Sequence, residues 1–195
     1  MSISKKIKQL EKEIKKLKEL VYKDELTKLY NRRGFKEEAE KFISQIIASK
    51  KYQEKRKSFF IKNFSLIVFD IDDFKKLNDE YGHPAGDEGL KLFSNLILER
   101  VRNIDVVARW GGEEIIIGLV GASENDAYNI ADDIREKLEK KELIYHRQKI
   151  KFTVSGGVAS FEEAKDFDHL FDCTDKALYK AKRTGKNKII KHSDL

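Results

Sequence analysis

The apolar residues of the first 23 positions recur at alternating intervals of four and three. They are Ile3, Ile7, Leu10, Ile14, Leu17 and Val21. Such a heptad pattern puts them on one side of a helix and is typical of a coiled coil. An isolated helix of this length is marginally stable in water, so the apolar stripe needs a partner. We expect a parallel two-stranded coil that makes the chain a homodimer, with packing against the chain's own domain as the alternative. Residues 1–23 are thus expected to form a separate N-terminal helix and residues 24–195 one domain.

Helical and strand patterns alternate through the rest of the chain. We expect helices over 31–49, 74–81, 87–102, 124–140 and 168–184, and strands over 65–70, 105–109, 114–120, 149–160 and 188–191. Asn31 is expected to cap the first of these helices, and Gly185 to end the last. The polar residues 50–63 are expected to form a surface loop or insertion. This alternation predicts an α/β (α+β) sandwich, a central mixed sheet flanked by helices.

Glycine pairs and aromatic residues mark further positions. Gly111 and Gly112 lie between two strand patterns and predict a hairpin. Gly156 and Gly157 are expected to break the 149–160 strand. We expect Trp110 and Tyr179 to pack in the core.

The net charge of the chain is informative only when its distribution along the sequence is considered. The chain of 195 residues carries +6, but residues 1–23 carry +5 and residues 180–195 another +5, which leaves 24–179 at −4. A protein that binds a polyanion would spread basic residues over one face, so we expect no nucleic-acid partner. There is no apolar run of about 18 residues and no apolar segment typical of a secretion signal, so we expect no membrane insertion and a cytoplasmic protein. The single cysteine, Cys173, excludes a disulfide framework and is expected to be buried.

Two groups of carboxylates occupy predicted strand ends. Asp70 and Asp72 close the first buried strand, and Glu113 and Glu114 lie at the tip of the predicted hairpin. If that strand neighbours the hairpin, three or four carboxylates converge, which is costly without a cation. An all-oxygen set favours Mg²⁺ or Mn²⁺ over zinc, and such ions commonly also hold phosphates. The alternative is that these acids simply face water.

Other residues are suited to a nucleotide. A helix predicted to begin near Phe74 would point its first N–H groups toward an anion, with Lys75 in its first turn. Lys182 and Lys186 flank the end of the last long helix. Gly111 and Gly112 would let a bulky ligand approach the backbone. Taken singly, each lysine is more simply explained as solvated, and the glycines as ordinary turn residues.

Five motifs occur together in one order. They are DELTKLYNRRGF at 24–35, DIDDFKKLND at 70–79, GHPAGD at 82–87, RWGGEEI at 109–115 and DKALYKAKRTGKN at 175–187. In these motifs the chain resembles the GGDEF family, the diguanylate cyclases, over roughly residues 24–191. The resemblance implies a fold similar to nucleotide cyclases and polymerase palms. It also implies the condensation of two GTP molecules to cyclic di-GMP with release of two pyrophosphates. The resemblance further implies that each domain holds one GTP, so we expect two active sites to face each other in a dimer.

The resemblance also implies residue roles. Asp70, the Ile71 carbonyl and Glu113 are expected to bind two Mg²⁺ or Mn²⁺ ions per half-site. Residues expected to be catalytic are Asp70, Lys75, Glu113 and Glu114. Residues expected to bind substrate are Phe74, Lys75, Asn78, Asp87, Gly111, Gly112, Lys182 and Lys186. Among these, Asn78 and Asp87 are the expected guanine readers, because a carboxylate can accept from guanine N1–H and N2–H.

Arg102 and Asp105 match the family's RxxD inhibitory site in sequence and in offset from the signature. The resemblance therefore implies product inhibition by cyclic di-GMP at these residues. The alternative is an ordinary ion pair between residues three apart, which contributes little.

The chain departs from the family pattern at two positions. Lys186 replaces the usual Arg, which keeps a charge but loses a bidentate donor. Ile115 replaces the usual Phe and is expected to point to the core. The leading hypothesis is an active cyclase. A catalytically silent module that binds cyclic di-GMP or GTP is the first alternative, and a palm-like polymerase or a cyclase of another nucleotide is the second.

Overall fold

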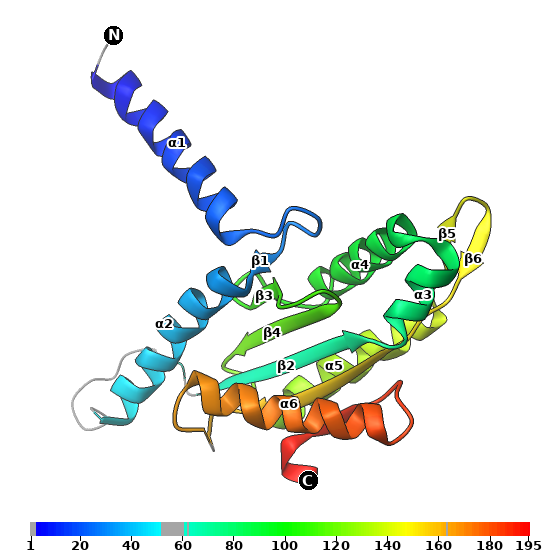
Figure 1. Cartoon of the computed structure of the whole chain (residues 1–195). Coiled ribbons are helices and arrows are strands. Elements are labelled where there is room, and N and C mark those ends of the chain that lie inside the picture. The colour runs from blue at the N-terminus through cyan, green and yellow to red at the C-terminus, as the bar shows by residue number, and fades with distance from the viewer. Residues whose placement is uncertain (1–2, 52–60, 62, 163) are drawn as a thin grey trace.

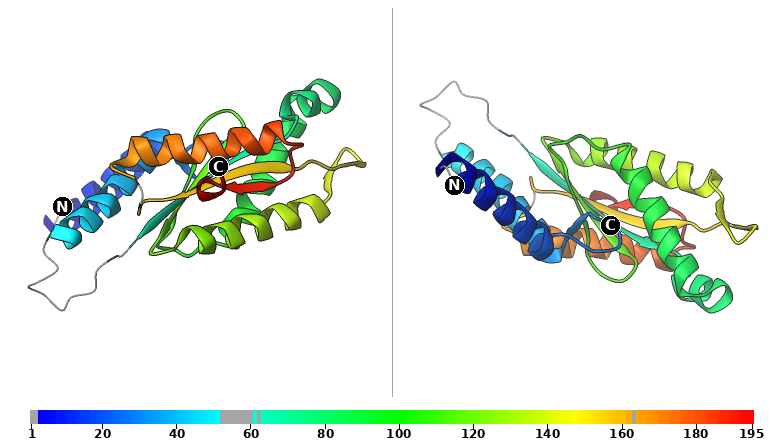
Figure 2. Two further views of the ribbon diagram at one scale, coloured as in Figure 1. Left: turned by 90° about the horizontal axis from the view of Figure 1, so that it is seen from below. Right: turned by 90° about the horizontal axis from the view of Figure 1, so that it is seen from above.

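The computed structural model describes residues 3–51, 61, 63–162 and 164–195. Its helices are α1 (Ile3–Tyr22), α2 (Arg32–Lys51), α3 (Phe74–Tyr81), α4 (His83–Leu98), α5 (Glu124–Lys140) and α6 (Phe167–Arg183), with a short 3₁₀ turn at His192–Asp194. Its strands are β1 (Tyr30–Asn31), β2 (Phe64–Ile71), β3 (Val106–Arg109), β4 (Glu114–Val120), β5 (Leu143–Tyr145), β6 (Gln148–Ile150), β7 (Val154–Ser160) and β8 (Ile189–Lys191). Six strands form a central sheet in the order β1-β3-β4-β2-β7-β8, with helices on both faces (Figures 1 and 2). The sheet is mixed, as predicted: β1–β3 and β7–β8 are parallel and the other pairs antiparallel.

Strand β2 is buried along its whole length and divides two hydrophobic cores. Ile67 and Phe69 pack on one face with α4 and α5, and Leu66 and Val68 pack on the other with α2 and α6. Since successive residues of a strand point to opposite faces, Asp70 follows Leu66 and Val68 onto the α6 face. This alternation positions the first carboxylate of the predicted site.

Several predicted bounds agree with the structure and one helix is shifted. The predictions for α3, α5 and β4 match residue for residue. Helix α4, however, begins at His83 instead of residue 87 and ends at Leu98 instead of residue 102. The reason is that Gly82, with φ of 87°, caps both the end of α3 and the start of α4. Pro84 then lies in the first turn of α4, where a backbone N–H would have no partner within the helix, so the N–H that proline lacks is not missed.

The predicted strand 149–160 is two strands. Residues 148–150 pair with β5 in a separate hairpin that the sequence pattern did not reveal, and β7 begins at Val154. The turn of that hairpin uses His146 and Arg147, both at positive φ, which are not typical turn residues. Gly156 and Gly157 do not break the strand, because both lie inside β7. A Cβ at Gly157 would collide with the backbone of α6, so glycine is needed there for close packing.

Helix α6 ends where the sequence predicts, but Tyr179 does not lie on its buried face as predicted. Gly185 has φ of 113°, and the Lys186 N–H donates to the Ala181 carbonyl at 3.0 Å, which closes the helix as expected. Cys173 is buried, as predicted, and so is Trp110. The prediction that Tyr179 packs in the core is wrong. This side chain is 63% exposed, because the buried stripe of α6 runs through residues 170, 173, 174, 177, 178 and 181 on the other side.

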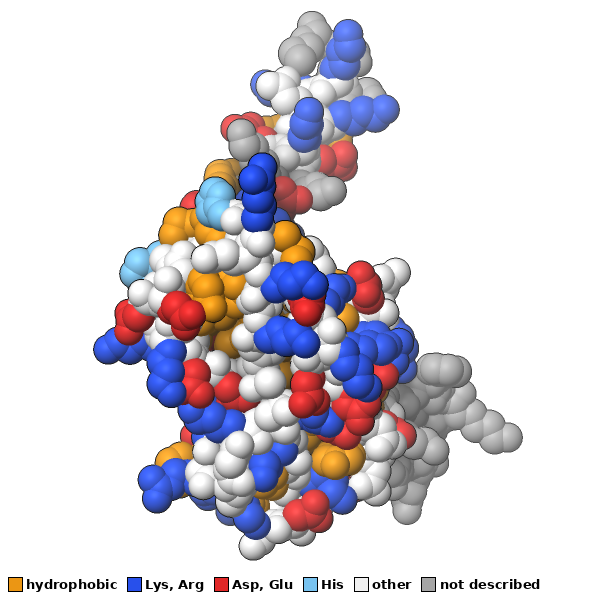
Figure 3. All heavy atoms as spheres, turned by 90° about the vertical axis from the view of Figure 1, so that its right-hand side faces the viewer, with side chains coloured by type: hydrophobic (Ala, Val, Ile, Leu, Met, Phe, Trp, Pro, Cys, Tyr) orange, Lys and Arg blue, Asp and Glu red, His pale blue; other side chains and the backbone are white. Residues whose placement is uncertain are grey.

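Helix α1 projects from the domain (Figure 1), and the apolar stripe along it is uncovered. Ile7, Leu10, Ile14, Leu17 and Val21 are 44–56% exposed. Basic side chains extend from the same helix (Figure 3). Of the alternatives drawn from the heptads, packing along the chain's own domain is therefore not what the structure shows. On the face seen in Figure 3, acidic and basic side chains intermingle. None of the helices in the described ranges is long and apolar enough to span a membrane.

Asn31 joins α1 to the domain. Its Nδ2 donates to the Val21 carbonyl at the end of α1 (2.8 Å), and its Oδ1 accepts from the Gly34 N–H at the start of α2 (2.9 Å). The predicted cap of α2 is thus confirmed, and the same amide also caps α1. The polar segment 50–63 lies largely outside the described residues: 50 and 51 belong to α2, and 52–60 and 62 are not described.

Candidate functional site

The carboxylates of β2 and of the β3–β4 hairpin lie next to each other. Asp70 pairs with Glu114 in the β2–β4 register, and Glu113 lies in the turn just before β4. The predicted neighbourhood of strand and hairpin is therefore confirmed. Ile115 is fully buried on the opposite face from Glu114, as the strand alternation predicts, so its replacement of Phe concerns packing.

Asp70 is held in an ion pair with α6. Its Oδ2 lies 2.6 Å from the Lys182 Nζ, and its side chain is only 10% exposed. Burial raises the pKa of Asp70, Lys182 opposes this shift, and the charges of Glu113 and Asp72 add to it. Asp70 is therefore a carboxylate whose ionised form depends on nearby positive charge.

Glu114 is in a similar electrostatic position. Burial raises its pKa first, the negative charge of Asp70 raises it further, and Lys182 opposes the shift. Asp175 also raises the pKa of Glu114, which places this α6 residue near the site. Asp175 was not among the predicted site residues, although its spacing of seven from Lys182 puts both on one helix face.

The donors at this edge suit a hard divalent cation. Asp70, Glu113 and the Ile71 carbonyl offer only oxygen atoms, and burial raises the pKa of Asp70 first, with the negative charges of Glu113 and Asp72 adding to the shift. In the described part of the chain, no three His, Cys, Asp or Glu side chains lie close enough together to hold a metal ion. The expected convergence of three or four carboxylates is therefore not found in this arrangement. The smaller set of two carboxylates and one carbonyl fits the cation by its chemistry.

The β3–β4 turn is open on its outer side. A Cβ at Gly112 would meet no atom within 4 Å, and Gly112 is not at positive φ. Arg109 braces the turn, because its Nε and Nη2 donate to the Gly112 carbonyl at 3.0 and 2.8 Å. Arg109 also reaches Asp24, at 3.3 Å, and so ties the turn to the segment that follows α1.

Asn78 lies where α3 meets α4. Its Oδ1 is buried and accepts no hydrogen bond within the described part of the chain. A side chain at Gly86 would collide with this atom and crowd Phe74, so the glycine keeps the Asn78 amide in place. Asp87 follows Gly86 and is exposed. An unsatisfied acceptor against Gly86, with an exposed carboxylate on the next residue, fits a ligand that carries N–H donors.

Two of the three lysines expected to bind phosphate contact aspartates at the end of β2 and in the turn after it. Lys182 binds Asp70, and Lys186 Nζ lies 2.8 Å from Asp73 Oδ2. Hydrogen bonding to Asp73 raises the pKa of Lys186, and Lys186 in turn lowers that of Asp73. Lys75, the third expected phosphate ligand, is exposed on α3.

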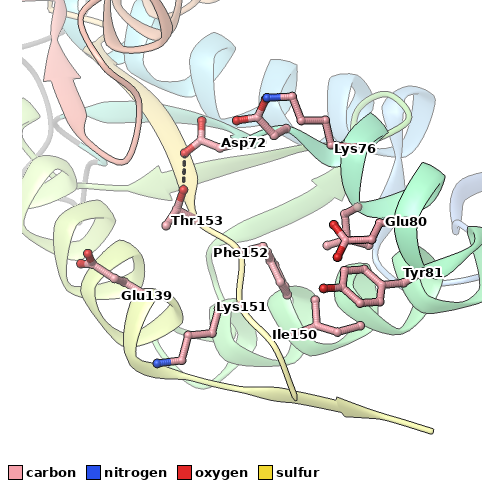
Figure 4. A pocket seen from close by; sticks show the side chains of 11 residues that line it. Asp72, Lys76, Glu80, Tyr81, Glu139, Ile150, Lys151, Phe152 and Thr153 are labelled. Carbon is pink, nitrogen blue, oxygen red and sulfur yellow. Dashed lines mark hydrogen bonds and ion pairs between the residues drawn. The ribbon is translucent and has the colours of Figure 1, made fainter. Parts of the chain in front are cut away.

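Asp72 is used for structure. It accepts a hydrogen bond from Thr153 Oγ1 at 2.7 Å (Figure 4). It also accepts from Ser155 Oγ at 2.7 Å and from the Asn187 N–H at 3.0 Å. Asp72 and Asp73 also form part of the wall of a cavity of about 430 Å³ between α3, the segment before β7 and the end of α5. None of the residues expected to be catalytic or to bind substrate or metal lines this cavity.

Arg102 and Asp105 contact each other. Arg102 donates from Nε and Nη2 to the two carboxylate oxygens at 3.1 and 2.9 Å, and Asp105 also accepts from the Val120 N–H at 3.0 Å. The Asp105 side chain is 1% exposed and that of Arg102 is 61% exposed. The pair therefore has the geometry of the ordinary ion pair, and Arg102 is its exposed member.

The family assignment follows from comparison with known proteins. The family described as "Diguanylate cyclase, GGDEF domain" matches residues 21–188. The chain belongs to this family. It is 37% identical over 167 residues to diguanylate cyclase DosC of Escherichia coli K12, which covers 85% of this chain and 34% of DosC. The chain thus spans about a third of the length of that relative.

Solved structures confirm the predicted fold. The coiled coil and GGDEF domain of DgcB from Caulobacter crescentus, in complex with c-di-GMP, superimposes with a TM-score of 0.85 over 96% of this chain and 94% of that chain, at 22% identity. The active GGEEF domain of a diguanylate cyclase from Vibrio cholerae has a TM-score of 0.70, at 29% identity over 83% and 96% of the two chains. The arrangement of a projecting helix before the domain is therefore shared with DgcB.

Proposed function

We propose that this chain condenses two GTP molecules to cyclic di-GMP as a homodimer in which each domain holds one GTP. The observation that carries the proposal is the placement of Asp70 opposite Glu114, with Glu113 in the adjacent turn and Lys182 against Asp70. Acidic oxygen donors and a lysine at one edge suit a triphosphate and its cations.

Each group has a task derived from its position. Asp70, Glu113 and the Ile71 carbonyl would hold divalent Mg²⁺ or Mn²⁺. The cations would supply Lewis acidity and neutralise charge on the triphosphate. Lys182 and Lys186 would bind phosphate oxygens, and the open space over Gly112 would admit the nucleotide close to the backbone.

Base recognition is assigned to the junction of α3 and α4. The unsatisfied Oδ1 of Asn78 and the exposed carboxylate of Asp87 are acceptors, as guanine N1–H and N2–H require. Adenine lacks this pair of donors. Asp87→Ala should therefore reduce the preference for GTP over ATP in a binding competition.

Dimerisation and product inhibition complete the proposal. The uncovered stripe of α1 would pair with a second copy and bring two half-sites together. Arg102 is exposed enough to bind cyclic di-GMP, and the buried Asp105 would hold its guanidinium in place at this inhibitory site. Arg102→Ala should then remove inhibition by added product while leaving the initial rate in place.

The test is incubation of nucleotide-free protein with GTP and Mg²⁺, or Mn²⁺, followed by liquid chromatography and mass spectrometry for cyclic di-GMP. Asp70→Ala and Glu113→Ala serve as controls. Product from the wild type alone supports the cyclase. Tight binding of cyclic di-GMP without any product at high protein concentration would make the chain a receptor instead.

A further inference from the structure

Lys186 is bound to a carboxylate of its own chain at the place where the proposed function requires it to bind phosphate. Its ammonium lies 2.8 Å from Asp73, which also contacts Lys76 at 2.8 Å. An ammonium group that is paired with an aspartate interacts less strongly with a triphosphate. Asp73 and the triphosphate therefore compete for Lys186.

The backbone that carries Lys186 is fixed independently of Asp73. Lys186 and Asn187 have φ of 60° and 45°, a left-handed conformation that persists only where surrounding contacts impose it. The Asn187 N–H donates to Asp72 at 3.0 Å, and its Nδ2 donates to Glu139 of α5 at 2.9 Å. Removing the Asp73 charge therefore frees the side chain of Lys186 and leaves the turn in position.

The contact between Asp73 and Lys186 is also weak enough to exchange. Their side chains are 41% and 40% exposed, and ion pairs of such exposure change an equilibrium by about fivefold at most. Asp73 keeps Lys76 as a partner when Lys186 leaves. Asp70 differs, because it is buried and belongs to the proposed cation site.

We propose that Asp73 limits the affinity of this site for a nucleoside triphosphate by holding the Lys186 ammonium, which passes from Asp73 to a phosphate oxygen when the nucleotide binds. The inference rests on the proposed function and deepens it. Asp73 acts here through Lys186, so it is a positioning residue that sets affinity and touches no reacting atom.

The experiment is titration of the full, nucleotide-free chain with GTP in excess EDTA, so that binding is measured without cations and without turnover. Asp73→Asn is the main variant, because asparagine tolerates the left-handed φ of 55° at this position. We expect it to bind GTP about two- to tenfold more tightly than the wild type, since the competitor and a like charge are both lost. The gain should shrink as salt is added.

Two further variants separate competition from general charge. Glu80→Gln makes the same charge change near the other end of α3, at a residue that hydrogen-bonds Tyr81, and should tighten binding less. Lys186→Met should weaken binding, and in that background Asp73→Asn should give no more than the Glu80→Gln effect.

The outcomes are distinct. If wild-type protein binds GTP but Asp73→Asn binds it equally or more weakly, the inference is wrong and the proposed function stands. If Asp73→Asn gains the same amount with and without Lys186, competition for that lysine is also wrong. If the wild type binds GTP neither with Mg²⁺ nor without it, the proposed function itself fails.

Discussion

Single residues at the tip of the β3–β4 hairpin differ in what surrounds them. A Cβ at Gly111 would lie 2.7 Å from Glu114 Oε2, whereas one at Gly112 would meet open space. Neither glycine is at positive φ. Glycine at 112 is therefore not required by the packing of the domain, which agrees with the proposed approach of a nucleotide to this turn.

We therefore predict that Gly112→Ala leaves the stability of the domain almost unchanged but weakens the binding of GTP. The free energy of unfolding should change by less than about 1 kcal/mol, because alanine fits the backbone there. GTP affinity should fall about tenfold, because a methyl group would crowd the nucleotide. Urea unfolding and GTP titration measure the two effects. Unaltered GTP binding would contradict the placement of the nucleotide over the turn.

Asp24 predicts a pH dependence of stability. Burial by itself would raise its pKa, but hydrogen bonds from Thr27 and the charge of Arg109 outweigh it and lower the pKa. A carboxyl whose folded pKa lies below its unfolded pKa adds stability above the unfolded value, near 4, and loses it as pH falls through the folded value.

Asp24→Asn should consequently be less stable than the wild type near pH 7. The gap between them should narrow as pH falls from about 5 to about 3. Urea unfolding of both proteins across this range is the measurement. A gap that stays constant would show that Asp24 acts through packing and not through its charge.

At the scale of elements, the position of α6 determines where Lys182 and Asp175 lie. The helix crosses β7 at Gly157 with no room for a side chain. Gly157→Ala should destabilise the domain by about 1–3 kcal/mol, because α6 must move away. It should also weaken GTP binding, which Gly112→Ala would do without destabilisation. Wild-type thermal stability in Gly157→Ala would refute this account of the packing.

Elements with a strong period were predictable from the sequence, and those set by tertiary contacts were not. The apolar period predicts α5, and the structure adds a Ser123–Asp126 capping box at its start. The β5–β6 hairpin was missed because its turn residues, His146 and Arg147, give no local signal. Tyr179 was misplaced because an aromatic residue alone does not say which face of α6 is buried.

The candidate site was likewise predictable only in part. The strand period alone is enough to place Asp70 and Glu114 on the strand faces that they occupy. The contacts of Lys182 with Asp70 and of Lys186 with Asp73 were beyond the sequence, because they join residues more than 110 positions apart through the packing of α6. Asp73 and Asp175 gained their significance only from their spatial neighbours.

At the scale of the whole molecule, the proposed reaction needs two copies of the domain, each holding one GTP. The uncovered stripe of α1 should form a contact between two copies of the chain, in addition to the contact between facing half-sites. Each leucine buried in the α1 contact stabilises the dimer by about 1.5–3 kcal/mol. Leu10→Asp combined with Leu17→Asp should yield a monomer by light scattering. The variant should bind GTP normally and form cyclic di-GMP at least tenfold more slowly at the same concentration.

Lys12→Asp, on the same helix but outside the stripe, is the matched control. It should remain dimeric and active. Dimers that persist in the double leucine variant would place the contact between copies elsewhere on the domain.

Because the Asn31 amide holds both the end of α1 and the start of α2, any rotation of the N-terminal helix about its axis is passed on to the domain. An α-helix turns about 100° per residue. Seven residues added within α1 would rotate the domain about 20° short of two full turns and leave the two halves facing each other. Two added residues would rotate it by about 200° and turn the halves apart. The angular phase of the helix, and not its length, would then decide whether two bound nucleotides can meet.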